Sequence, residues 1–290
     1  MTASHYLLPE GNVQIAFSGG RTSAFMLRQI LDANHGVIGI DPRVQVTFQN
    51  TGREMPQTLD FVAEVGRRWN VPIVWLEYLP TAPYFKIVNH DNAARNGEPF
   101  DALIDKKQYL PNQRTRFCTI ELKIRTAKRY LMSLGWDRWV NAIGIRADEP
   151  KRLDRPPPKD RWTVWTPLAK AGVSRNDVAA FWDEQPFDLM LPNVGGKCWL
   201  GNCDGCFLKS EANIAAFTRD FPDRAAWWER AEARIAMGPK MKNRPKDNAQ
   251  FSTRYSRAEM REFMDRQGDA YETLVDVGAL CQADDGECTI

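Results

Sequence analysis

The stretch Val13–Ser23, Val-Gln-Ile-Ala-Phe-Ser-Gly-Gly-Arg-Thr-Ser, decides the fold class of this 290-residue chain. Val13–Phe17 is an apolar-rich run that predicts a strand, and a helical pattern over 22–31 follows Ser18-Gly19-Gly20. Glycines let the backbone approach a ligand closely, and a helix N-terminus offers free N–H groups to an anion. This order therefore predicts a phosphate-binding loop, with an ordinary tight turn as the alternative.

Strands and helices alternate over the first two-thirds of the chain. Strands are expected at 44–49, 72–76, 138–145 and 163–168, and helices at 54–69, 120–134 and 174–182. The alternation predicts an α/β fold with a doubly wound parallel sheet. Ligands of such sheets bind at the carboxyl ends of the strands, where Ser18 and Asn50-Thr51-Gly52 fall. The segment 84–113 has no clear period, so we expect a lid or an inserted subdomain there.

The composition is that of a globular protein, with 43% hydrophobic and 26% charged residues, and the net charge of +2 points to no class of partner. No apolar run is long enough to span a membrane, so we expect no membrane partner. Met1–Glu10 lacks the features of a signal peptide, which favours a cytoplasmic location. In that compartment, six cysteines indicate metal binding or catalysis rather than disulfides.

The loop Ser18–Ser23 resembles the SGGxxS pyrophosphate loop (PP-loop) of the adenine nucleotide α-hydrolase superfamily, in particular its phosphoadenosine phosphosulfate reductase branch. It departs from the commonest form, SGGKDS, because Arg21 replaces Lys and Thr22 replaces Asp. An arginine still matches two phosphate oxygens at once. The family usually gives this aspartate a role in metal binding or in fixing the loop, and Thr22 has no carboxylate for that role.

Three later segments strengthen the resemblance. Asn50–Glu54 is similar to the family's (D/N)TG.E element, and Gly144–Arg152 is similar to its GIRxxES..R segment. Trp165–Leu168, followed by 174–182, resembles its PL block and the helix after it. The resemblance implies an adenine nucleotide ligand, with Mg²⁺ accompanying ATP. It assigns Arg146 and Arg152 to catalysis and the following residues to nucleotide binding: Ser18, Gly19, Gly20, Arg21, Thr22, Ser23, Asn50, Thr51, Gly52 and Gly144.

The character of the chain changes after about residue 190. We therefore divide it into a PP-loop nucleotide-binding α/β domain, 1–190, and a Cys-rich loop with a helical region packed on that domain, 191–290. Helices are expected at 211–220, 223–237, 257–266 and 271–279, with a polar, basic and mobile loop at 238–250. Ser174 and Ser256 are each followed three residues later by a carboxylate, which predicts capping boxes.

Cysteines form the second strong signal. Cys198, Cys203 and Cys206 have the spacing C-x4-C-x2-C, and Cys118 is the fourth ligand candidate outside the tail. Four thiolates suit a [4Fe–4S] cluster, which we expect, or a structural zinc ion; a chain without metal is the third alternative. By resemblance, assimilatory adenylylsulfate reductases hold such a cluster with a Cys-Cys pair and a distant C-x2-C, and DNA-phosphorothioating members of the superfamily also have four-cysteine clusters. Cys118 stands where one cysteine of that pair would be, and Thr119 replaces the other.

The last residues supply a further candidate. Sulfonucleotide reductases end near Glu-Cys-Gly-(Ile/Leu)-His, and their cysteine attacks the sulfate sulfur; Glu287-Cys288 matches two of these residues. The resemblance makes Cys288 a candidate nucleophile. An incidental thiol and a Cys281–Cys288 redox pair are the alternatives.

Three functions remain open on the sequence. We favour cleavage of ATP at the α-phosphate, which activates an acceptor for sulfur transfer from a sulfur donor. The second is reductive cleavage of adenylylsulfate or its 3′-phosphate, with a thioredoxin-like reductant. The third is a metal-stabilised module that binds a nucleotide or a nucleic acid without catalysis. A nucleic acid is also a candidate acceptor, since 151–161 and 240–246 are basic.

Overall fold

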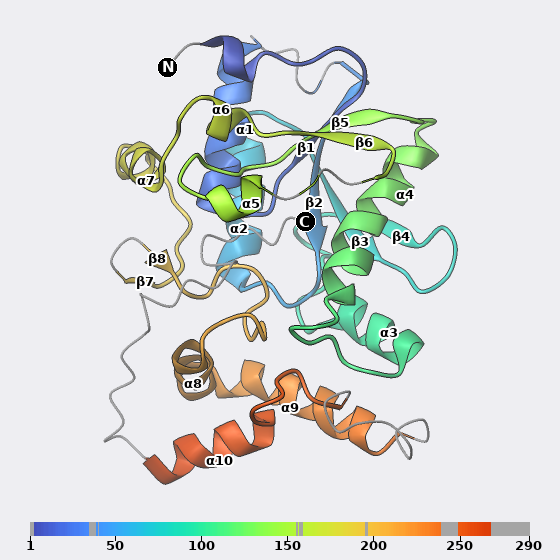
Figure 1. Cartoon of the computed structure of the whole chain (residues 1–290), viewed down its shortest axis with the longest axis vertical. Coiled ribbons are helices and arrows are strands. Elements are labelled where there is room, and N and C mark those ends of the chain that lie inside the picture. The colour runs from blue at the N-terminus through green and yellow to red at the C-terminus, as the bar shows by residue number, and fades with distance from the viewer. Residues whose placement is uncertain are drawn as a thin grey trace.

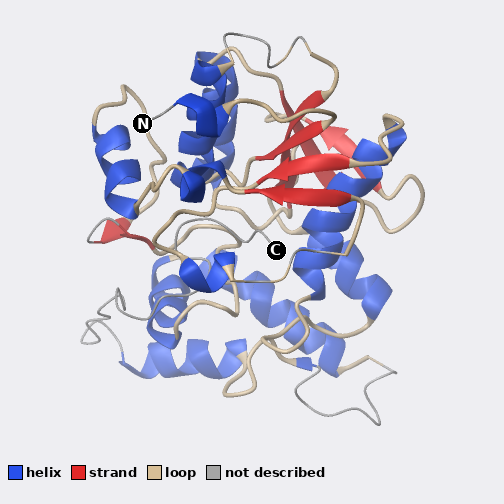
Figure 2. Cartoon of the chain, turned by 45° about the horizontal axis from the view of Figure 1, so that its top comes forward, coloured by secondary structure: helices blue, strands red, loops and turns tan. Residues whose placement is uncertain are grey.

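A six-stranded sheet is the centre of the computed structural model, which describes residues 3–34, 39, 41–154, 156, 159–194, 197–238 and 249–267. Its strands are β1 (Val13–Ala16), β2 (Val44–Asn50), β3 (Ile73–Tyr78), β4 (Phe85–Val88), β5 (Trp139–Ala142) and β6 (Trp162–Trp165). They lie in the order β4-β3-β2-β1-β5-β6; Figure 1 labels these strands, and Figure 2 shows the sheet in red. The predicted α/β fold is confirmed. The predicted strands pair in parallel, and the edge strand β4, which was not predicted, pairs with β3 in the antiparallel direction.

Helices cover both faces of the sheet. α1 (Arg21–Ala33) and α2 (Pro56–Arg68) lie on one side, and α3 (Glu98–Lys107) and α4 (Thr126–Ser133) lie on the other (Figure 1). The helix predicted at 54–69 is present as α2, and its Leu59, Val62 and Val65 are buried. Burial of an apolar stripe against the strands is what fixes helices to a sheet.

The segment 84–113 contains regular secondary structure, although its sequence has no clear period. It contains β4 and α3, and the N-cap of α3 is a glycine, Gly97, with left-handed backbone. The predicted helix at 120–134 begins as a π-helix, η2 (Thr119–Arg125), before it continues as α4. π-helical turns inside longer helices are often found at functional sites.

Shorter elements complete the first part: η1 (Ala3–Tyr6), α5 (Pro150–Leu153), α6 (Pro167–Lys170) and α7 (Arg175–Asp183). The predicted strand over 163–168 is shorter than expected, because α6 starts at Pro167. The predicted capping box at Ser174 is confirmed: its hydroxyl accepts from the backbone N–H of Asp177, whose carboxylate accepts from the backbone N–H of Ser174.

The later part consists of the hairpin β7 (Asn193–Val194) and β8 (Lys197–Cys198), followed by α8 (Glu211–Asp220), α9 (Pro222–Ala236) and α10 (Arg257–Gln267). These helices lie together at the end of the molecule opposite η1 (Figure 1). Their predicted bounds are confirmed to within one residue. The helix expected at 271–279 and most of the loop expected at 238–250 lie outside the described residues.

One hydrophobic core serves both parts. Ile15 and Phe48 of the sheet belong to the same buried cluster as Phe217, Trp228 and Phe251. None of the helices in the described ranges has the length and apolar character needed to cross a bilayer.

Candidate functional site

The loop between β1 and α1 has the geometry of an anion-binding turn. Gly19 has a φ of +82°, and a Cβ built on it would lie 2.8 Å from Thr58 Cγ2 and 3.2 Å from Val62 Cγ2. Glycine is therefore required by conformation and by space. The hydroxyls of Ser18 and Ser23 are 2.9 Å apart, and Ser23 Oγ donates to Gly20 O at 3.0 Å. Gly20 is the N-cap of α1 and has no side chain to cap it, so the helix end is suited to an external anion.

The sequence position of Arg21 predicts a contact with phosphate, and in the structure its guanidinium pairs with Asp188. Its Nε donates to Asp188 Oδ1 at 2.7 Å, and its Nη2 pairs with Asp188 Oδ2. The indole of Trp182 donates to the carbonyl of Arg21 at 3.0 Å. These contacts connect the first turn of α1 to α7 and to the segment after it. The role of Arg21 as a phosphate ligand stays a prediction.

Arg146 lies directly against the phosphate loop, although 124 residues separate it from Thr22. Its Nη1 donates to Thr22 Oγ1 at 3.2 Å and its Nε to Asp148 Oδ1 at 2.9 Å, and the residue is only 5% exposed. Gly144 is buried between Ile143 and Ile145, just after β5. The structure thus brings a guanidinium to the N-terminal end of α1, where both groups favour an anion.

Arg152 is held beside Arg146 by a shared carboxylate. Its Nη1 donates to Glu149 Oε1 at 2.6 Å, and Glu149 Oε2 accepts from the backbone N–H of Arg146 at 2.9 Å. Arg152 therefore orients the backbone of the Arg146 segment through Glu149. A direct contact of Arg152 with phosphate stays a prediction.

A pocket of about 600 Å³ of empty space begins at Ser18 and runs along the sheet face beneath η2 and α4. Its polar lining was not predicted from the sequence. Asn141 is 6% exposed, and its Oδ1 has no hydrogen-bond partner within the described part of the chain. The rings of Trp139 and Trp162 are stacked with centroids 5.6 Å apart. The wall also includes the amides of Gln14 and Gln49 and the ammonium groups of Lys123 and Lys128.

The loop after β2 connects this region with the cysteines. Asn50 is fully buried; its Nδ2 donates to Glu77 Oε1 at 2.6 Å, and its Oδ1 accepts from the N–H of Gly52 at 3.1 Å. Thr51 Oγ1 is 2.9 Å from both carboxylate oxygens of Glu54 and 3.4 Å from Cys203 Sγ. Asn50, Thr51 and Gly52 thus form a rigid turn at the carboxyl end of β2 that touches a cysteine. Their contact with a nucleotide stays a prediction.

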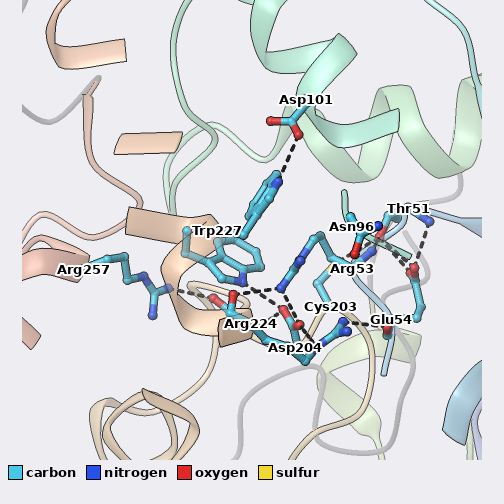
Figure 3. Close-up of polar contacts among 12 residues, drawn as sticks. Thr51, Arg53, Glu54, Asn96, Asp101, Cys203, Asp204, Arg224, Trp227 and Arg257 are labelled. Atoms are coloured by element: carbon cyan, nitrogen blue, oxygen red, sulfur yellow. Dashed lines mark hydrogen bonds and ion pairs between the residues drawn. The ribbon is translucent and has the colours of Figure 1, made fainter. Parts of the chain in front are cut away.

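Asp204 connects the cysteine turn to this loop and was missed from the sequence (Figure 3). It is 0% exposed, and its carboxylate accepts from Arg53 Nη2 at 2.7 Å, Arg224 Nε at 2.6 Å and Trp228 Nε1 at 2.8 Å. Glu54 and Cys203 also form a β-bridge. The only local signal was an aspartate between two cysteines, since its cationic partners come from α9 and the β2 loop.

Cys203 and Cys206 lie on one turn, in which the N–H of Cys206 donates to the carbonyl of Cys203 at 3.2 Å. Burial and the Glu54 carboxylate raise the pKa of the Cys203 thiol well above its ordinary value, while Lys123 and the Thr51 hydroxyl act in the opposite direction. Lys123 also lines the pocket, so the cysteine turn and the pocket share a cation.

Three of the four cysteines expected to bind a metal, Cys118, Cys203 and Cys206, have side chains that the structure describes. Cys118 is the N-cap of η2 and is partly buried against the main core. The side chain of Cys198 and the whole of Cys281 and Cys288 lie outside what the structure describes. Among the described side chains, no group of three or more His, Cys, Asp or Glu is arranged to hold a metal ion. A pair of thiols on one turn is half of the ligand set that a cluster or a zinc ion requires.

Comparison with known proteins identifies the family of this chain. The family model described as "Phosphoadenosine phosphosulfate reductase domain" matches residues 12–171, more than half of the chain. The "Uncharacterized nin region protein ORF290" of Escherichia phage lambda is 34% identical over 223 residues, which cover 71% of this chain and 69% of the phage protein. The crystal structure of phosphoadenylyl-sulfate (PAPS) reductase from Candida auris, a phosphate complex, is 18% identical with a TM-score of 0.39, covering 65% of this chain and 81% of that one.

Proposed function

Because the chain belongs to the phosphoadenosine phosphosulfate reductase domain family, we propose that it binds ATP and cleaves it at the α-phosphate to activate an acceptor for sulfur transfer. The observation that carries this proposal is the contact between Arg146 and Thr22 at the open N-terminus of α1. A buried guanidinium, free helix N–H groups and the Ser18 and Ser23 hydroxyls together suit a pyrophosphate group.

The pocket beside the loop is suited to the nucleoside. It contains about 600 Å³ of empty space, part of it open to solvent, and Ser18 of the phosphate loop is in its wall. The Asn141 amide lies on the floor with an unpartnered Oδ1, and asparagine amides match the hydrogen-bonding edge of adenine. Trp139 and Trp162 offer apolar ring surface nearby. An adenosine in this pocket would have its phosphates beside Ser18.

The reaction that we propose has two displacements. An oxygen of the acceptor attacks the α-phosphorus, the bond from that phosphorus to the bridging oxygen breaks, and pyrophosphate leaves with the electron pair. A sulfur nucleophile then attacks the adenylated acceptor, and AMP leaves in the same way. Negative charge grows on the leaving pyrophosphate, where Arg146 and the α1 N-terminus supply fixed positive charge.

Replacement of Arg146 by glutamine tests the phosphate site. We expect Mg-ATP to bind about 10- to 100-fold more weakly, because a charge-assisted hydrogen bond in a buried site contributes about 1.5–3 kcal/mol. Isothermal titration calorimetry gives the affinity. Arg161→Gln is the control, since Arg161 pairs with Asp137 at the surface, and it should bind like the unmodified chain. Equal affinity of Arg146→Gln and the unmodified chain would contradict the assignment.

The family's name favours a second candidate, reduction of a sulfonucleotide with Cys288 as nucleophile. In that reaction the thiolate attacks the sulfate sulfur, the nucleoside phosphate leaves, and a dithiol reductant releases sulfite from the thiosulfonate. The same calorimetry separates the two candidates. Tenfold or greater preference for adenylylsulfate or its 3′-phosphate over Mg-ATP would favour the reductase.

We also propose that the cysteine set Cys118, Cys198, Cys203 and Cys206 holds a [4Fe–4S] cluster, with zinc as the alternative. A cluster would supply electron transfer or sulfur binding next to the pocket. Protein purified without oxygen should contain about four iron atoms and as much acid-labile sulfide per chain. Cys206→Ser should lose both, whereas the tail variant Cys281→Ser should keep them. Zinc at about one ion per chain would support the alternative. Protein that contains neither iron nor zinc would contradict both metal proposals.

A further inference from the structure

A second cavity lies away from the phosphate loop, between α8, α9 and α10. It contains about 1080 Å³ of empty space, part of it open to solvent. Its wall combines apolar side chains with five charged ones, three of which come from α10. The residues used below are Phe217, Pro222, Ala226, Arg257, Arg261 and Met264. We call this cavity the helical groove.

Arg257 is the buried charge of the helical groove. The residue is 5% exposed, its Nη2 donates to Gly205 O at 2.7 Å, and its buried Nε has no hydrogen-bond partner among the residues that the structure describes. Its guanidinium also lies over the rings of Trp228 and Phe251, 5.4 Å and 5.9 Å from their centroids. Within the described residues Arg257 forms no ion pair with a carboxylate at 4.0 Å or less. Glu232 interacts with it electrostatically, but its two oxygens accept from the backbone N–H groups of Phe251 and Arg257. A buried guanidinium with donor capacity left over favours an incoming anion.

The carboxylates in the groove already have partners. Arg261 Nε donates to Glu229 Oε2 at 2.9 Å, and Arg261 Nη1 donates to Asp265 Oδ2 at 3.1 Å. Arg219, also in the lining, pairs with Asp220. Arg261 therefore engages both acidic groups of the wall, and within the described residues neither carboxylate pairs with Arg257.

The N-terminus of α9 adds to this attraction. The helix begins at Pro222, its N-cap Phe221 makes no side-chain cap, and Pro222, Ala225 and Ala226 line the groove. A 15-residue helix presents the positive end of its dipole there. The aromatic ring of Phe217 and the side chain of Met264 supply apolar surface beside it.

We propose that the helical groove binds a small organic phosphate, with its phosphate group at Arg257 and the start of α9 and its apolar body against Phe217 and Met264. This site is independent of the ATP site proposed above. It is nevertheless close to the cysteine turn, because Arg257 donates to Gly205 O and the neighbouring wall residue Trp228 donates to Asp204. The bound ligand would contact the two side chains that hold that turn.

Phenyl phosphate is a suitable probe, because it has an aromatic body and no nucleoside. We expect the full chain to bind it, to bind phenol at least tenfold more weakly, and to lose at least tenfold in affinity on Arg257→Gln. Ala226→Phe should block the groove while leaving the contacts of Arg257 in place, so it keeps the test valid if Arg257→Gln fails to fold.

Two results would overturn the proposal. One is phenyl phosphate binding to Ala226→Phe as tightly as to the unmodified chain. The other is loss of phenyl phosphate binding in Arg146→Gln, which would place the probe at the phosphate loop. Mg-ATP should bind Ala226→Phe as tightly as it binds the unmodified chain. Calorimetry with phenyl phosphate and with Mg-ATP therefore tests the groove proposal and the ATP proposal separately.

Discussion

Replacement of Gly19 by alanine is expected to reduce the affinity for Mg-ATP by about 100-fold and to lower the free energy of unfolding by about 2–5 kcal/mol. The new Cβ would lie 2.8 Å from Thr58 Cγ2 and 3.2 Å from both Phe48 Cε2 and Val62 Cγ2. These atoms belong to packed elements, so the loop itself must move. A shift of about 1 Å removes the N–H groups from a phosphate, and misplacement on that scale costs on the order of 100-fold.

Gly11→Ala is the matched control for this prediction. Gly11 has a φ of +79°, close to the +82° of Gly19, but a Cβ on it would meet no atom within 4 Å. Both variants have the left-handed strain of about 1–2 kcal/mol, and only Gly19→Ala adds an overpacking term of about 1–3 kcal/mol. Urea unfolding and calorimetry with Mg-ATP measure the two effects. Equal behaviour of the two variants would show that space around Gly19 has no role.

Elements encoded by neighbouring residues could be predicted from the sequence. The strand, glycine turn and helix of the phosphate loop depend on a local pattern, and so does the capping box at Ser174. The strand β4 could not be predicted, because it is a half-exposed edge strand of four residues with no alternation. Its pairing with β3 provides the hydrogen bonds that its own sequence does not specify.

Contacts between distant residues explain what the sequence left open at the site. Arg146 was placed near phosphate by resemblance, but its contact with Thr22 depends on how β5 lies beside β1. The guanidinium of Arg21 is occupied by Asp188, 167 residues away, and no local pattern indicates such a pair. The pocket was missed for the same reason, since Gln14, Asn141 and Trp162 come together only on the face of the folded sheet.

Replacement of Asp204 by asparagine is expected to lower the free energy of unfolding by about 3–5 kcal/mol, the effect of breaking a buried ion pair on one side. The carboxylate is fully buried and accepts from Arg53, Arg224 and Trp228 (Figure 3). The side chain of Arg53 is only 3% exposed. Burial lowers the pKa of Arg53 and the Asp204 charge raises it, so asparagine would leave a buried guanidinium without its counter-charge.

Urea unfolding measures this effect, and Asp220→Asn is its control. Asp220 pairs with Arg219 near the surface, where loss of an ion pair changes stability by about 0–1 kcal/mol. The double variant Arg53→Met with Asp204→Asn should recover part of the loss, because it removes the unpaired charge as well. An Asp204→Asn chain as stable as the Asp220→Asn chain would show that this pair does not hold the cysteine turn. The alternative result is a loss of about 3–5 kcal/mol in Asp204→Asn, part of which the double variant recovers. That result would show that the buried Arg53–Asp204 ion pair holds the cysteine turn against the loop after β2.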